Sequence, residues 1–194
     1  MPMNKMINSI LAGFMIGLGG FVYLSVENKY IGAFLFALGL LTIISKGYNL
    51  YTGKIYDFRL KLHSIEEKCN MLLGNFIGGY FFAGGMIRAI GIRTDDLWLY
   101  KLNKGILEVF FLSVICGILM YLAVTLYKKE QNPLYVIMPI MVFILAGCEH
   151  CIANIFYWSL YTNPMDIRIP IYIIINILGN SIGSIIFYQL ENRM

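Results

Sequence analysis

Long apolar runs separated by short polar segments occupy almost the whole chain. Six of these runs reach the ~20 residues that an α-helix needs to cross a bilayer, at roughly 7–26, 31–60, 69–90, 105–127, 133–160 and 169–190. The second and fifth runs are longer than one crossing requires, and glycine and polar residues interrupt both. The pattern predicts an all-α integral membrane protein with six transmembrane helices, of which the second and fifth are broken.

The composition agrees with this prediction. Hydrophobic residues make up 59% of the chain and charged residues 13%, whereas a soluble domain has ~25% charged residues. Most of the surface must therefore face lipid. The net charge of +4 is modest and spread over the loops, so it gives no indication of nucleic-acid binding. The four cysteines lie mostly in apolar surroundings, which favours reduced thiols over a disulfide framework.

The two interruptions are the most informative local feature. One comprises Lys46-Gly47-Tyr48-Asn49 and extends to Gly53, and the other is centred on Gly147-Cys148-Glu149. Non-helical backbone at membrane depth is tolerated only where protein or a water-filled cavity satisfies its polar groups. The free N–H groups at the start of a half-helix also favour anions. The two breaks together predict a pore for an anionic solute.

A repeated motif relates the two halves of the chain. The segments 73–79 (LGNFIGG) and 178–184 (LGNSIGS) share the pattern L-G-N-x-I-G followed by a small residue. Each half contains three spans, an odd number, so the second half must enter the membrane from the opposite side. The sequence therefore predicts one channel domain over residues 1–194, built from inverted repeats at about 5–92 and 101–192.

The predicted loops differ in positive charge. If the N-terminus is inside, the inner loops hold eight lysines and arginines and the outer loops hold six. Four of the inner ones, Lys54, Arg59, Lys61 and Lys68, are interpreted as a basic loop that faces the membrane surface. Positive residues are enriched on the cytoplasmic side. The difference predicts a multi-pass protein of the cell (plasma or inner) membrane with both termini in the cytoplasm.

His150 lies beside Glu149 in the interrupted fifth run. Ionisable residues at membrane depth usually face a cavity or a pathway, so we interpret His150 as the functional centre; the alternative is a structural histidine. Cys148 and His150 would point to nearly opposite sides of a helix, and His63, the other histidine, is expected in a loop. Zinc needs three or four converging ligands, so no metal site is predicted.

Five segments resemble the formate/nitrite transporter family: 12–19 (AGFMIGLG), 49–53 (NLYTG), 73–75 (LGN), 147–154 (GCEHCIAN) and 178–180 (LGN). The resemblance runs through all six spans. It implies an aquaporin-like fold, a homopentamer with one pore per protomer, and conduction of small monovalent anions such as formate, nitrite, lactate or hydrosulfide. It implies no cofactor, and the expected partners are the anion, protons and the lipid bilayer.

The resemblance also assigns roles to individual residues. His150 is implied as the central pore histidine and Thr52 as its partner across the pore, although Thr52 could also cap a short half-helix after the break. The implied apolar constriction residues are Phe36, Leu40, Leu50, Tyr51, Phe143 and Ala153. The implied polar residues with structural roles near the pore are Glu149, Asn154, Asn75 and Asn180.

Three lysines resemble the vestibule residues that attract anions: Lys5 and either Lys101 or Lys104, with a solvated loop as the alternative for the last two. Two positions depart from the family pattern. Gly117 stands where the fourth span usually carries a pore asparagine, and Asn176-Ile177-Leu178 stands where the sixth usually has Pro-Val-Thr.

An anion in such a pore meets a large barrier. Moving a bare carboxylate-sized ion into dry protein costs on the order of 20 kcal/mol in the Born limit. His150 could donate a proton so that the neutral acid crosses, or it could stay neutral and only hydrogen-bond; proton donation is the preferred hypothesis. The predicted function is a channel for small monovalent anions, formate or nitrite first, with hydrosulfide or lactate as the alternative.

Other classes of protein receive less support. An intramembrane enzyme that used Glu149 and His150 as an acid/base pair would lack a nucleophile motif such as G-x-S-x-G, so no enzymatic activity is predicted. A water or glycerol channel would share the fold, but the sequence lacks paired Asn-Pro-Ala loops. A scaffold protein would leave the two breaks unexplained.

Overall fold

The computed structural model describes residues 3–58 and 61–193, and the regular structure within them is helical. Arg59 lies outside the described residues. The helices are α1 (Met3–Ser25), α2 (Lys29–Lys46), α3 (Leu62–Phe76), the π-helix η1 (Ile77–Ala83), α4 (Gly84–Ala89), α5 (Asp95–Leu102), α6 (Ile106–Glu130), α7 (Leu134–Leu145), α8 (Cys151–Ser159) and α9 (Arg168–Glu191). The predicted all-α class is confirmed.

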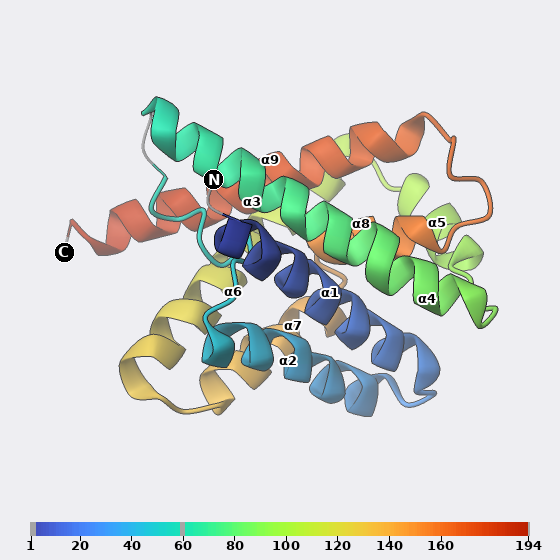
Figure 1. Cartoon of the computed structure of the whole chain (residues 1–194), viewed down its shortest axis with the longest axis horizontal. Coiled ribbons are helices and arrows are strands. Elements are labelled where there is room, and N and C mark those ends of the chain that lie inside the picture. The colour runs from blue at the N-terminus through green and yellow to red at the C-terminus, as the bar shows by residue number, and fades with distance from the viewer. Residues whose placement is uncertain (1–2, 59–60, 194) are drawn as a thin grey trace.

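Each predicted run contains helix, with boundaries that differ from the prediction. Among the described residues, four helices are long and apolar enough to cross a membrane: α1, α2, α6 and α9. The third run is formed by α3, η1 and α4 in continuous succession (Figure 1). The fifth is divided between α7 and α8 by residues 146–150. That all six runs span the membrane stays a prediction.

The segment after α2 differs from the prediction. Residues 47–58 form turns and bends, so the half-helix expected after the break is absent there and Thr52 caps none. Gly47, Gly53 and Asp57 have low helix propensity, and the backbone of this segment bonds to other helices instead. His63, expected in a loop, lies in the first turn of α3.

The helices form two groups that meet along α2 and α7. α1 packs against α2, α3 and η1, whereas α6 packs against α7 and α9. α8 packs against α1, η1 and α9. In Figure 1, α1 begins and α9 ends on the left, where α2 and α6 also end. We call this the terminal side; α5 lies on the opposite side.

Two glycines permit close contacts between helices in corresponding places of the two halves. A Cβ atom on Gly13 of α1 would lie 2.1 Å from the carbonyl oxygen of Asn75, and one on Gly117 of α6 would lie 2.2 Å from that of Asn180. Both distances are far shorter than van der Waals contact, so only glycine fits. Small residues at helix interfaces are typical of membrane helix pairs.

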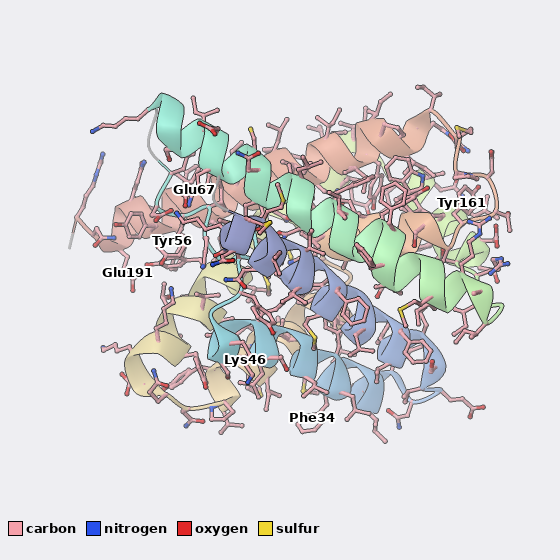
Figure 2. The ribbon with its side chains drawn as sticks, in the orientation of Figure 1. Phe34, Lys46, Tyr56, Glu67, Tyr161 and Glu191 are labelled. Atoms are coloured by element: carbon pink, nitrogen blue, oxygen red, sulfur yellow. The ribbon has the colours of Figure 1, made fainter. Side chains whose placement is uncertain are left out.

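Apolar side chains cover much of the outer surface. Phe34 and Leu38 of α2 are 49% and 58% exposed, and Phe111 of α6 is 58% exposed. Figure 2 shows Phe34 at the edge of the molecule, pointing away from the other helices. An apolar surface of this extent is typical of contact with lipid or with another membrane subunit.

Candidate functional site

The two breaks begin with the same turn. α2 and α7 are each followed by a glycine with positive φ, Gly47 at 70° and Gly147 at 68°. In each case the N–H of this glycine and the next N–H donate to carbonyls in the last turn of the helix. Glycine adopts this left-handed conformation without the steric penalty of other residues. The chain therefore leaves both helices in the same way.

The side chain of Asn75 in α3 stabilises the non-helical backbone of the first break. Its Oδ1 accepts a hydrogen bond from the backbone N–H of Tyr51 at 2.8 Å. Its Nδ2 donates to the carbonyls of Ser9 and Asn49 at 2.7 and 2.8 Å. One fully buried amide thus satisfies two peptide groups of the break and also binds a carbonyl of α1.

Asn180 of α9 makes the corresponding contacts at the second break. Its Oδ1 accepts from the N–H of Cys151 at 2.9 Å, and its Nδ2 donates to the carbonyls of Ser113 and Glu149, both at 2.8 Å. Asn75 and Asn180 both lie in the L-G-N motif. The structure therefore gives the repeated asparagine a physical role, which is to support non-helical backbone.

Thr52 and His150 come from opposite breaks and meet. Thr52 Oγ1 lies 2.9 Å from His150 Nε2, and the two residues are 0% and 2% exposed. The sequence resemblance placed these side chains across from each other, and in the structure they are in direct hydrogen-bond contact. Their role in a pore stays a prediction.

His150 is also the N-cap residue of α8. Its Nδ1 accepts a hydrogen bond from the backbone N–H of Ala153 at 3.1 Å. A nitrogen that accepts carries no proton, so the neutral ring has its proton on Nε2. Nε2–H then donates to Thr52, and the Thr52 hydroxyl keeps its own hydrogen to donate to a solute. The pair therefore presents donors at the centre of the molecule.

Apolar side chains surround this donor pair. The Phe36 and Phe143 rings pack edge to face with centroids 5.8 Å apart, and the Phe143 centroid lies 5.8 Å from that of His150. Leu40, one turn along α2 from Phe36, is fully buried, as is Leu50 of the first break. These side chains form an apolar barrier around the Thr52–His150 contact.

A cavity lies on each side of this barrier. The opposite-side cavity has a volume of about 190 Å³ and reaches Phe143, His150 and Ala153. The terminal-side cavity has a volume of about 100 Å³ and reaches Leu40 and Leu50. Among the described residues, none lines both cavities. Leu40 and Leu50 line one cavity, and Phe143 and Ala153 line the other. That these residues constrict a pore between two vestibules stays a prediction.

Tyr51 is the exception among the implied constriction residues. Its hydroxyl lies 2.9 Å from Ser181 Oγ of α9, and its side chain lines a groove between α3 and α9. Tyr51 therefore lines this groove and neither of the two cavities.

Glu149 is fully buried and binds two lysines. Lys101 Nζ lies 2.5 Å from one carboxylate oxygen and Lys104 Nζ lies 2.8 Å from the other. Asn154 Nδ2 donates to the same carboxylate at 2.9 Å and also contacts the Asn176 amide oxygen. A buried charge is stable only when it is paired and hydrogen-bonded, so this cluster holds the second break against α5 and α9.

The implied vestibule lysines lie in different surroundings. Both Lys101 and Lys104 line the opposite-side cavity, so the structure brings both to His150 instead of one. Lys5 pairs with Glu67 at 3.0 Å on the surface and does not line the terminal-side cavity.

Sequence reasoning missed three polar residues near the site. Asn176 is fully buried beside Asn154; an amide inside the apolar run of α9 was a signal for it. Lys54 and Lys128 line the terminal-side cavity. Lys54 was interpreted as part of a surface loop, and nothing local in the sequence distinguishes Lys128 from the neighbouring lysine.

Gly117 of α6 packs directly against the backbone of α9 at Asn180. Its missing side chain makes room for the Asn180 backbone. Gly117→Asn is therefore expected to destabilise the protein by about 1–3 kcal/mol through overpacking. Thermal unfolding in detergent would measure this loss. Gly105→Asn is the control, since a Cβ there meets nothing within 4 Å. Equal stability of the two variants would contradict the packing argument.

Comparisons with known proteins agree with this geometry. A family model described as formate/nitrite transporter matches residues 1–192. The formate channel FocA of Haemophilus influenzae is 24% identical, over 95% of this chain and 82% of that protein. A pentameric formate channel with formate bound superposes with a TM-score of 0.84 at 21% identity, covering 98% of this chain and 95% of that one.

A second solved structure, an FNT family ion channel, has a TM-score of 0.88 at 20% identity and covers 99% of this chain and 90% of that one. At these identities the structural matches establish the fold. The family model matches nearly the whole chain. The chain belongs to the formate/nitrite transporter family.

Proposed function

We propose that this protein is a membrane channel for small monovalent anions, with formate as the first candidate. The observation that carries the proposal is the Thr52–His150 contact, a pair of hydrogen-bond donors inside an apolar barrier between two cavities. The names of a relative and a structural neighbour, both formate channels, support the choice of formate. Nitrite, hydrosulfide and lactate are the other candidates.

In the proposed mechanism the anion replaces one of the two partners of the Thr52–His150 bond. It accepts a hydrogen bond from His150 Nε2–H, from the Thr52 hydroxyl, or from both, while apolar rings exclude bulk water. A hydrogen bond to a charged group contributes roughly 1.5–3 kcal/mol. The donors thereby offset part of the desolvation that an anion suffers between Phe36 and Phe143.

Hydrogen bonding by neutral His150 is better supported than proton donation, which the sequence had favoured. To donate a proton and end neutral, the ring must first carry protons on both nitrogens. A proton on Nδ1 would displace the hydrogen bond from the Ala153 N–H. It would also place a charge beside the Phe143 ring, where burial disfavours it.

The proposal includes the architecture. The matching glycine turns and asparagine contacts support inverted repeats at residues 5–92 and 101–192 within one channel domain. The pentameric neighbour supports a homopentamer with one pore in each protomer. The excess of lysine and arginine on the terminal side supports cytoplasmic termini. No part of the site supports catalysis, since Glu149 is held by two lysines and an asparagine.

Flux assays in proteoliposomes test the function. The purified protein is expected to carry formate and nitrite at least tenfold faster than empty vesicles, and the ranking of formate, nitrite, hydrosulfide and lactate identifies the preferred anion. Internal pH is recorded together with anion uptake, because hydrogen bonding alone predicts no proton entry beyond the titration of the substrate itself. Failure to carry any of the four anions would refute the proposal.

A further inference from the structure

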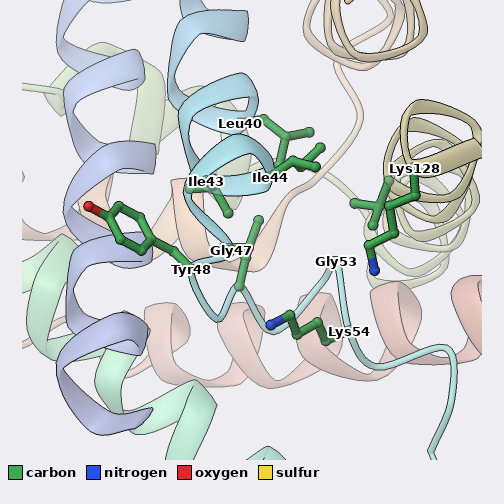
Figure 3. Close-up of a pocket in the computed structure, with 10 residues that line it drawn as sticks. Leu40, Ile43, Ile44, Gly47, Tyr48, Gly53, Lys54 and Lys128 are labelled. Carbon is green, nitrogen blue, oxygen red and sulfur yellow. The ribbon is translucent and has the colours of Figure 1, made fainter. Parts of the chain in front are cut away.

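The terminal-side cavity is lined by two lysines that the family resemblance does not single out. Lys54 follows the first break and Lys128 lies near the end of α6, and Figure 3 shows them on either side of Gly53. Leu40 and Leu50 line the same cavity, so it ends at the apolar barrier. Among the described residues, no carboxylate lines it.

Neighbouring carboxylates are engaged with other lysines. Asp57 lies 2.5 Å from Lys68 Nζ, and Glu67 lies 3.0 Å from Lys5 Nζ. Within the described part of the chain, the side chains of Lys54 and Lys128 contact uncharged groups: Lys54 Nζ donates to Asn49 Oδ1 at 2.6 Å, and Lys128 Nζ lies 6.0 Å from the centre of the Tyr56 ring. Both lysines line the cavity, and none of the described residues that line it carries a negative charge that would neutralise them.

The opposite mouth is built differently. Its two lysines, Lys101 and Lys104, share the single carboxylate of Glu149 at 2.5 and 2.8 Å. Each is already hydrogen-bonded to a negative group, so an anion must compete with Glu149 for them. Each mouth has two lysines, but only those of the opposite mouth are paired with a carboxylate. The terminal-side mouth should therefore attract an anion more strongly.

We propose that Lys54 and Lys128 form a binding site for a small monovalent anion, such as a carboxylate, at the terminal-side mouth, and that this mouth binds the anion more tightly than the opposite one. The inference rests on the proposed channel function. Positive charge at the mouth of a narrow cleft concentrates anions there by roughly 10-fold or more at low salt. A passive channel carries equal fluxes in both directions at equal concentrations, so the asymmetry appears in the half-saturating concentration from each side.

Uptake by oriented proteoliposomes tests this site. A C-terminal affinity tag captures vesicles whose terminal side faces outward, and the uncaptured vesicles present the opposite side. Formate uptake is measured as a function of formate concentration at fixed ionic strengths of about 20 mM and about 300 mM, where screening is weak and strong. The variants are Lys54→Gln, Lys128→Gln and Lys54→Arg, and the control is Lys129→Gln.

Lys129 is a matched control because it neighbours Lys128 and its side chain is 78% exposed beside Glu130. At low ionic strength Lys54→Gln and Lys128→Gln should each raise the half-saturating formate concentration from the terminal side about 3- to 10-fold. From the opposite side the change should stay below about 2-fold, and at high ionic strength both effects should shrink. Lys54→Arg and Lys129→Gln should match the wild type.

Three results would overturn the inference: Lys128→Gln equal to Lys129→Gln, equal shifts from both sides, or shifts that are independent of salt. Lys128 is exposed at the end of a helix, so its variant keeps the test decisive if Lys54→Gln fails to assemble. If the wild type carried no anion, the proposed function itself would fail. If the wild type conducts formate and the variants leave the half-saturating formate concentration unchanged, only this site is rejected and the proposed function stands.

Discussion

His150→Phe is expected to carry no formate above the background of empty vesicles while keeping its fold and oligomeric mass. Phenylalanine preserves much of the ring volume beside Phe143 but removes the Nε2–H donor and leaves the Thr52 hydroxyl as the remaining donor. Losing one hydrogen bond to a charged solute costs roughly 1.5–3 kcal/mol, which corresponds to about 10- to 150-fold in rate. Anion uptake into proteoliposomes, with native mass spectrometry of the same sample, measures both properties.

His150→Asn separates the two mechanisms. Asparagine is a good N-cap residue, so its Oδ1 can replace Nδ1 as the acceptor for Ala153 while its Nδ2 still offers donors to the pore. It cannot supply a proton near neutral pH. If His150 only hydrogen-bonds, this variant should conduct formate within about 10-fold of the wild type. Proton-coupled uptake in the wild type that disappears in His150→Asn would show that His150 transfers protons after all.

Glu149→Gln is expected to be the most destabilising single substitution near the site. The change removes the charge that two lysines share and turns an amide N–H₂ group toward one of them. Removing one partner of a buried ion pair costs about 3–5 kcal/mol, because the remaining charge stays buried. For a protein of this length the corresponding fall in Tm is on the order of 10 °C, measurable by thermal unfolding in detergent.

Two further variants test the cause of this loss. Glu130→Gln breaks an ion pair whose side chains are 45% and 78% exposed, and exposed pairs contribute less than about 1 kcal/mol. The double variant Lys101→Met/Glu149→Gln should regain part of the stability, since it removes the buried lysine that Glu149→Gln leaves unpaired. A double variant that is less stable than the sum of its single changes would argue against a shared electrostatic cluster.

The elements that depend on periodicity and glycine pattern were well predicted from the sequence. Apolar length located the helices, and the repeated L-G-N motif pointed to the two asparagines that turned out to support the breaks. The interruption of the fifth run was also located correctly, because Gly147 and the ionisable pair after it are unusual in an apolar segment. These signals are local, so a single sequence contains them.

Features that depend on three-dimensional partners were not predictable in the same way. The absent half-helix after Thr52 follows from the bonds of this segment to Asn75, and the direction of Tyr51 follows from the same geometry. That Lys101 and Lys104 both reach Glu149 depends on where α5 docks against the second break. The terminal-side role of Lys128 depends on how α6 approaches the loop after α2, which no pattern along the chain encodes.

The asparagine supports also bear on how the protein is made. The hydrogen bonds of Asn75 reach residues 9, 49 and 51, and those of Asn180 reach residues 113, 149 and 151. Each half of the chain therefore contains the asparagine that satisfies the backbone of its own break. Since the N-terminal half leaves the ribosome first, its break can be in place before the second half is inserted. The Thr52–His150 contact joins the two halves, so it can form only after both breaks are in place.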